Sequence, residues 1–121
     1  MPVAALTTLG CKVNQYETEK IAEEFAQAGF TLTDFDAPAD VYVINSCSVT
    51  AAADRKSRYL ARKAARTNPD ALVVMTGCHS QQTLDDGGTV DGASLLVPNH
   101  EKEKVFARVA EVRPDLLLLS S

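Results

Sequence analysis

The sequence predicts an α/β fold: a three-layer domain of βα repeats around a mostly parallel sheet of about five strands. Three observations predict this class. Short apolar runs alternate with segments of helical periodicity along the chain. Two of these runs, 41–44 and 71–75, are apolar throughout, as strands covered on both faces tend to be. The length of 121 residues suits one domain with its own core.

The first βα unit covers residues 3–28. Residues 3–9 (VAALTTL) are apolar and partly β-branched, which favours a strand. Asn14 can cap the following helix with Glu17 as its reciprocal partner, and Gly29 can stop that helix after about Ala28. The apolar face of this helix is formed by Ile21, Phe25 and Ala28.

The second unit begins with a short strand at 30–33 and a loop at 34–40 that contains a proline. The apolar run 41–44 is then a buried strand. Thr50 can cap a helix over residues 51–66, which ends before an Asn-Pro-Asp turn.

The C-terminal part continues the alternation. After the strand 71–75, the sequence predicts a short helix at 80–85, a last short strand at 94–97, and a helix from about His100 to Val112. This βα order predicts right-handed crossovers and a flavodoxin- or Rossmann-like arrangement.

Each of the three cysteines, Cys11, Cys47 and Cys78, follows a predicted strand within about three residues. The carboxyl ends of parallel strands lie at one edge of the sheet, where functional groups gather. The thiols can therefore meet in space although 36 and 31 residues separate them. They also precede helix starts, where the positive end of the helix dipole favours the thiolate that binds metals. We favour a shared metal site over three separate buried core thiols.

Thiolate-rich sites hold zinc, copper(I) or iron–sulfur clusters. A structural zinc site needs a fourth ligand, for which His79 and His100 are candidates unless they are exposed polar side chains. A cubane cluster held by three cysteines leaves one iron open to a small ligand such as a sulfur species. The spacing of the cysteines leaves both possibilities open.

Composition limits the setting of the protein. The net charge is −4, and no run of about 18 apolar residues indicates a membrane span. The first residues lack the basic and apolar regions of a signal peptide, and three cysteines do not form a paired disulfide framework. We expect a cytoplasmic protein with no membrane partner.

Three cysteine-containing segments carry a resemblance to a known family. TLGCKVNQYETEK (7–19), ADVYVINSCSVTAAADRKSR (39–58) and VVMTGCHSQ (73–81) closely resemble the N-terminal domain of the radical SAM methylthiotransferases. The likeness covers residues 3–81 well and extends weakly to about Val112. The stretches SVT (48–50) and DRKSR (54–58) are most similar to the branch that acts on threonylcarbamoyladenosine in tRNA, whereas residues 79–80 and 98–99 depart from the family pattern.

The resemblance implies that Cys11, Cys47 and Cys78 hold a [4Fe–4S] cluster with one open iron. That iron would carry the sulfur inserted at C2 of threonylcarbamoyladenosine, next to the anticodon. A second [4Fe–4S] cluster, in a radical SAM domain, would cleave S-adenosylmethionine to make the radical.

The chain lacks the C-x-x-x-C-x-x-C motif of that radical SAM domain. Residues 1–112 are therefore interpreted as the cluster-binding domain, and 113–121 as a linker toward a radical SAM domain and a TRAM domain of the same polypeptide. Alone, the chain should bind a cluster without turning over substrate.

Two asparagines flank the cysteine loops. Asn14 and Asn45 can form capping and turn hydrogen bonds, or they can support the cluster ligands from behind.

The helix at 51–66 is strongly basic. Six of the twelve Lys and Arg residues lie between Arg55 and Arg66. At helical spacing one stripe of this helix gathers Arg55, Arg58, Tyr59, Arg62 and Arg66, with Lys56 and Lys63 beside it. The apolar residues Ala53, Leu60, Ala61 and Ala64 lie opposite and can pack on the sheet. The stripe is either a solvated face or a contact for the tRNA backbone, with Tyr59 available for stacking.

Two other functions compete with the methylthiotransferase hypothesis. One is a zinc-stabilised α/β binding module without redox chemistry. The other is a flavodoxin-like ligand or phospho-receiver domain, which is disfavoured because no acidic cluster follows the first strand and no G-x-G-x-x-G motif is present.

Overall fold

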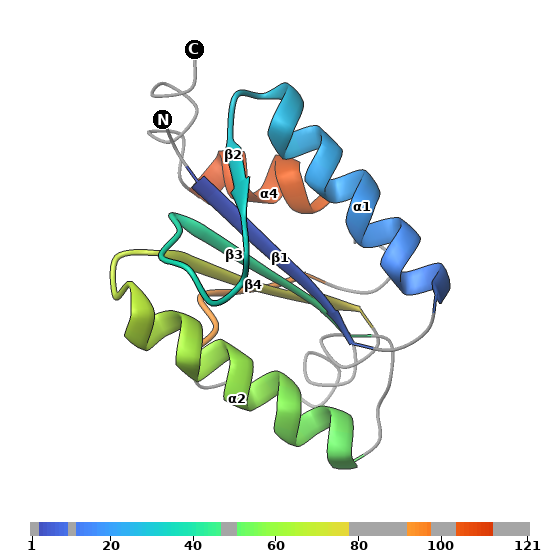
Figure 1. Cartoon of the computed structure of the whole chain (residues 1–121), viewed down its shortest axis with the longest axis vertical. Coiled ribbons are helices and arrows are strands. Elements are labelled where there is room, and N and C mark those ends of the chain that lie inside the picture. Colours follow the sequence, from blue (N-terminus) through green and yellow to red (C-terminus); the bar gives the residue numbers. More distant parts are fainter. Residues whose placement is uncertain (1–2, 10–11, 47–50, 78–91, 98–103, 113–121) are drawn as a thin grey trace.

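The structure is a computed structural model that describes residues 3–9, 12–46, 51–77, 92–97 and 104–112. These residues form five strands and three helices (Figure 1). In chain order the elements are β1 (Val3–Leu9), α1 (Lys12–Gln27), β2 (Thr31–Thr33), β3 (Val41–Ser46), α2 (Ala51–Thr67), β4 (Leu72–Gly77), β5 (Leu95–Val97) and α4 (Val105–Val112).

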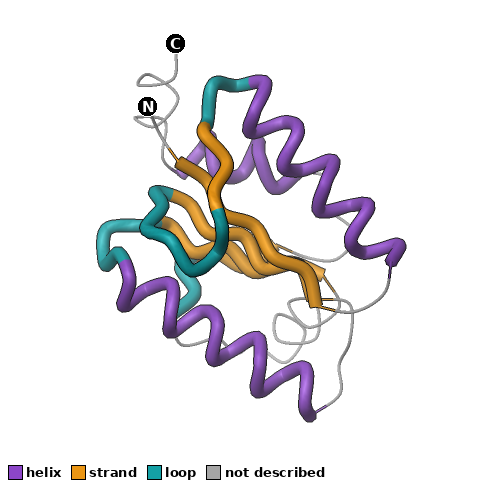
Figure 2. The backbone as a smooth tube through the Cα atoms, viewed as in Figure 1, coloured by secondary structure: helices purple, strands orange, loops and turns teal. Residues whose placement is uncertain are grey.

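The five strands form one sheet in the order β2-β1-β3-β4-β5, and every neighbouring pair is parallel. Helices α1 and α4 cover one face and α2 covers the other, which gives three layers (Figures 1 and 2). This arrangement confirms the predicted α/β class and its sheet of about five strands. Its strand order is that of flavodoxin-like sheets, in which the winding direction reverses between β1 and β3.

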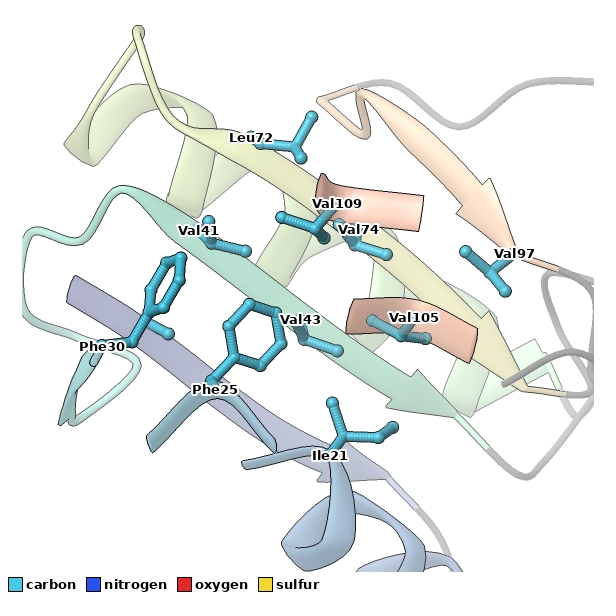
Figure 3. Close-up of a cluster of buried hydrophobic side chains, with 11 residues drawn as sticks. Ile21, Phe25, Phe30, Val41, Val43, Leu72, Val74, Val97, Val105 and Val109 are labelled. Atoms are coloured by element: carbon cyan, nitrogen blue, oxygen red, sulfur yellow. The ribbon is translucent and has the colours of Figure 1, made fainter. Parts of the chain in front are cut away.

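Alternate side chains of the central strands point to opposite faces of the sheet. On the α1 side, Val41, Val43 and Val74 pack against Ile21 and Phe25 (Figure 3). On the α2 side, Tyr42, Ile44, Val73 and Met75 pack against Ala61 and Ala64. Ala61 and Ala64 are small, so α2 can lie close to the sheet. Both belong to the apolar face that the sequence predicts for this helix.

Three phenylalanines join α1 to α4. The Phe25 ring centroid lies 5.0 Å from that of Phe30 and 5.1 Å from that of Phe106, and both pairs are edge-to-face. Such pairs add attraction beyond the area they bury. Because Phe106, Val105 and Val109 all belong to this core, α4 is an integral part of the domain.

The observed element bounds differ from the predicted ones at the strand ends. β3 continues to Ser46 and β4 to Gly77, two residues beyond the predicted ends, because the polar residues Asn45 and Thr76 still pair across the sheet. β5 begins at Leu95, one residue later than predicted, and β2 begins at Thr31. Phe30 precedes β2 and is buried in the core.

The start of α1 was also predicted wrongly. α1 begins at Lys12, so Asn14 lies inside its first turn and does not cap it. Asn14 therefore does not occupy the capping position at which its pairing with Glu17 was expected. Only two residues separate β1 from α1, which leaves no room for a cap as late as Asn14. The predicted helix at 80–85 and the predicted helix start at His100 lie outside the described residues.

None of the helices formed by the described residues has both the length and the apolar character needed to span a membrane.

Candidate functional site

β1, β3 and β4 end side by side. In the sheet register Leu9 pairs with Ser46, and Ser46 pairs with Gly77. We call this row the carboxyl edge (Leu9, Ser46 and Gly77). The three strand arrows point toward this edge in Figure 1, and α1 and α2 begin on the same side. β1 and β3 are also the strands between which the winding reverses, which is the usual ligand position in such sheets.

The predicted ligands Cys11, Cys47 and Cys78 lie outside the described residues. The strand ends that precede these cysteines are described. Cys47 directly follows Ser46, Cys78 directly follows Gly77, and Cys11 comes two residues after Leu9. Among the described residues, no three His, Cys, Asp or Glu side chains are close enough to hold a metal ion. His79 and His100 likewise lie outside that part of the chain.

A second row, one residue before the carboxyl edge, is polar. Thr8 pairs with Asn45, and Asn45 pairs with Thr76. We call these three residues the polar row. The Asn45 amide Nδ2 donates to Thr18 Oγ1 on α1 at 3.0 Å, and Thr8 Oγ1 donates to the same oxygen at 2.7 Å. Thr76 Oγ1 donates to the Val97 carbonyl at 3.1 Å.

Asn45 is a fully buried strand residue, and its amide donates a hydrogen bond to Thr18 on α1. Thr18 was missed by the sequence analysis. A signal for it existed, because Thr18 lies three residues before Ile21 and seven before Phe25, on the buried face of the helix.

We predict that Thr18→Val destabilises the domain by about 1–3 kcal/mol, because Thr8 and Asn45 both lose a hydrogen-bond acceptor in a buried site. Urea unfolding followed by circular dichroism measures this change. Thr31→Val is the matched control, because Thr31 is exposed in the edge strand β2 and its replacement should be near neutral. A Thr18→Val protein as stable as its parent would contradict the role given to this hydroxyl.

The basic residues of α2 form an outward surface, as predicted. Arg55, Lys56, Tyr59, Arg62 and Arg66 are exposed, and we call these residues the basic face of α2. Arg58 is only half-buried and lies between this face and the sheet side of the helix. On the sheet side Ala61 and Ala64 are buried, together with Ser57, which the predicted apolar face did not include.

Charge is distributed unevenly between α2 and the rest of the chain. α2 carries six Lys and Arg residues against one Asp, a net charge of +5, so the remaining residues carry −9. One of these cations is engaged: the Lys63 ammonium donates a hydrogen bond to the Asp36 carboxylate, which raises the pKa of Lys63 above its ordinary value. The helix is thus a local site of positive potential on an acidic protein.

The fold and the carboxyl edge together define a doubly wound parallel α/β domain. The protein family UPF0004, described as an uncharacterized protein family, matches residues 3–92. The chain therefore belongs to the UPF0004 family.

Curated relatives indicate what members of this group do. The threonylcarbamoyladenosine tRNA methylthiotransferase MtaB of Bacillus subtilis is 42% identical over 95% of this chain and 26% of its own length. The MtaB protein of Aquifex aeolicus is 39% identical over 88% of the chain and 26% of its own length. The tRNA-2-methylthio-N(6)-dimethylallyladenosine synthase of Akkermansia muciniphila is 35% identical over 90% of the chain and 25% of its own length.

These relatives confirm the predicted resemblance to tRNA methylthiotransferases, including the threonylcarbamoyladenosine branch. The chain spans about a quarter of the length of the relatives it matches.

Proposed function

We propose that this chain is the domain of a tRNA methylthiotransferase that binds an auxiliary [4Fe–4S] cluster through Cys11, Cys47 and Cys78. The observation that carries the proposal is the register of the carboxyl edge, in which the strands before these cysteines end in one row. Neighbouring strands lie about 4.8 Å apart, so three adjacent strand ends span about 10 Å.

Chain connectivity limits how far each thiol can lie from that row. Consecutive α-carbons are about 3.8 Å apart, which keeps Cys47 and Cys78 within one such step of their strand ends and Cys11 within two. All three thiols are therefore within reach of one small inorganic core. The donor set also fits: three thiolates suit an iron–sulfur cluster and leave one iron of a cubane without a cysteine.

When bound, the cluster would supply an open iron that carries the sulfur destined for C2 of threonylcarbamoyladenosine, next to the anticodon. The chain's own residues prepare that position. The polar row and its bonds to Thr18 hold β1, β3 and α1 together directly behind the cysteine loops. We assign Asn45 to this support. Asn14, in the first turn of α1, is proposed to support the Cys11 loop.

We further propose that the complete enzyme is a radical SAM methylthiotransferase. Residues 1–112 form its cluster-binding domain, and 113–121 lead toward the domain that binds S-adenosylmethionine and a second [4Fe–4S] cluster. A TRAM domain of the same polypeptide and the basic face of α2 contact the tRNA. On this face Arg55, Lys56, Arg62 and the neighbouring Arg58 meet phosphates, and Tyr59 stacks on a base. The chain by itself is inactive because it lacks the radical-generating site, and the enzyme acts in the cytoplasm.

The identity of the metal is tested by anaerobic reconstitution of the chain with iron and sulfide, and in parallel with zinc alone. We expect a brown protein with about four irons per chain and the thiolate-to-iron charge-transfer absorption of a cubane cluster. Mössbauer spectra should distinguish one iron site from the other three. A colourless protein that binds one zinc and no iron would instead support the zinc-stabilised binding module.

A further inference from the structure

An open pocket lies beside the basic face of α2. Its volume is about 510 Å³, and it is lined by Tyr59, Arg62, Ala65, Arg66 and Gly92. We call it the Tyr59 pocket. This volume falls in the range of about 300–1,000 Å³ typical of small-ligand sites. Gly92 was not among the residues predicted to contact RNA, and it reaches the pocket from a different part of the chain.

The side chains of this pocket are available to a ligand. Tyr59 is 51% exposed, and Arg62 and Arg66 are exposed beside it. Tyr59, Arg62 and Arg66 are spaced by three and four residues, so they lie on one side of the helix. Among the described residues neither Arg62 nor Arg66 forms a salt bridge, whereas the neighbouring Lys63 is bound to the carboxylate of Asp36.

The other wall of the pocket is fixed by Gly92. Its φ is +88°, and a Cβ atom built on it would lie 2.7 Å from the Ala61 carbonyl oxygen and 2.9 Å from the Arg62 Cα. Only glycine fits such a close approach to the helix backbone. The following residues are anchored to the sheet, because the Ser94 amide donates to the Val73 carbonyl at 2.7 Å. The pocket is therefore built from a packed helix and an anchored turn.

We propose that the Tyr59 pocket binds one unstacked nucleotide of the RNA substrate, with its base on the Tyr59 ring and its phosphate between Arg62 and Arg66. Proteins bind single-stranded RNA by stacking its bases on aromatic rings and by contacting its phosphates with cationic side chains. The exposed Tyr59 ring beside two guanidinium groups offers both kinds of contact. This inference rests on the proposed function, in which the chain acts on tRNA.

The position of the pocket indicates which nucleotide it takes. α2 begins on the same side of the sheet as the carboxyl edge (Figure 1), and Tyr59 is eight residues along it. At 1.5 Å per residue, Tyr59 lies about 12 Å along the helix from its first residue, and α2 runs from there away from the side of the carboxyl edge. The bound nucleotide is therefore a neighbour of the modified adenosine in the same strand, and the pocket helps to set which adenosine reaches the cluster.

The test compares two fluorescently labelled probes bound to the full chain: a short single-stranded oligoribonucleotide, and a strand with the same phosphates but no bases. We expect Tyr59→Ala to weaken binding of the first probe about 10-fold and to leave the second unchanged, whereas Tyr59→Phe keeps parental affinity for both. Arg62→Gln should weaken both probes and reduce the salt dependence of binding by about one phosphate contact.

Lys20→Gln is the matched control. Lys20 is exposed, is eight residues along α1 as Tyr59 is along α2, and lies in the opposite layer. The Lys20→Gln protein should bind both probes with the affinity of the parent chain. If the parent chain binds the base-free strand and the oligoribonucleotide with equal affinity, the proposal that the Tyr59 pocket binds a base is overturned. The binding would then be explained by general attraction to phosphates. Displacement of the oligoribonucleotide by an acidic peptide, without any effect of Tyr59→Ala, would also overturn it and indicate a protein partner.

The cysteine variants separate this inference from the function on which it rests. Cys47→Ala changes the proposed cluster site and should leave oligoribonucleotide binding unchanged. If reconstitution succeeds and Tyr59→Ala has no effect, the pocket proposal alone fails. If the Tyr59 effect is present and iron is not bound, the cluster proposal alone fails.

Discussion

Replacing Cys47 by alanine should reduce the iron bound after anaerobic reconstitution at least about 10-fold, since loss of even an outer-shell partner costs metal sites about that much. Cys11→Ala and Cys78→Ala should have the same effect, because each proposed ligand serves a different iron and no fourth cysteine is available in the chain. Iron per chain and the Mössbauer spectrum of each variant measure the result. In the complete methylthiotransferase proposed above, each variant should also lose methylthio transfer.

Two controls make this expectation specific to the thiols. Ser48→Ala changes a polar side chain next to Cys47 and should leave iron binding at the parental level. Far-UV circular dichroism and urea unfolding should show that each cysteine variant keeps the fold, because the cysteines follow the strands and the described core is formed without them. A folded cysteine variant that retains the parental iron content would remove that residue from the ligand set.

Phe25→Ala should cost about 3–5 kcal/mol of unfolding free energy, which is a large part of the roughly 5–15 kcal/mol available to a domain. Phe25 is fully buried and meets Phe30 and Phe106 edge to face, so its removal leaves a cavity between α1, α4 and the sheet. Urea unfolding measures the loss, and the transition midpoint should fall with little change in slope.

Tyr16→Ala is the matched control for Phe25→Ala. Tyr16 lies on the same helix but is 58% exposed. The Lys20 ammonium lies over its ring, 4.9 Å from the ring centroid. Its replacement should change the unfolding free energy by no more than about 1 kcal/mol. Similar losses for the two variants would mean that the aromatic contacts of Phe25 do not hold α1 on the sheet.

The layers of this fold could be predicted from the sequence because burial on both faces leaves a local signal. Strands 41–44 and 71–75 are apolar at every position, which few loops or surface helices are. The strand ends could not be predicted in the same way. Asn45, Ser46 and Thr76 are polar, and they are strand residues only because neighbouring strands pair with them. This pairing depends on strands that are distant in the chain, so the residues around each strand end do not reveal it.

One part of the candidate site could be predicted from the sequence, and another part depends on tertiary packing. Topology alone predicts that the loops after β1, β3 and β4 share one edge, and the structure places the ends of these strands in one row. The grouping of the cysteines that follow them stays a prediction. The Tyr59 pocket could not be predicted, because Gly92 is distant in sequence from α2 and reaches it only through the packing of the turn on Ala61. Tyr42 illustrates the same limit: its apolar strand does not indicate that its hydroxyl donates to Ala37 and accepts from Ala39.

The aromatic contact between α1 and α4 has a consequence for synthesis. Phe106 belongs to the last described helix, yet it completes the packing of Phe25 in the first one. A nascent chain that has left the ribosome only as far as β5 has all five strands, but one side of α1 still faces water where α4 will lie. Since domains fold as units while they emerge, the sheet should reach its full stability only after α4 is released, and loading of the proposed cluster should follow that moment.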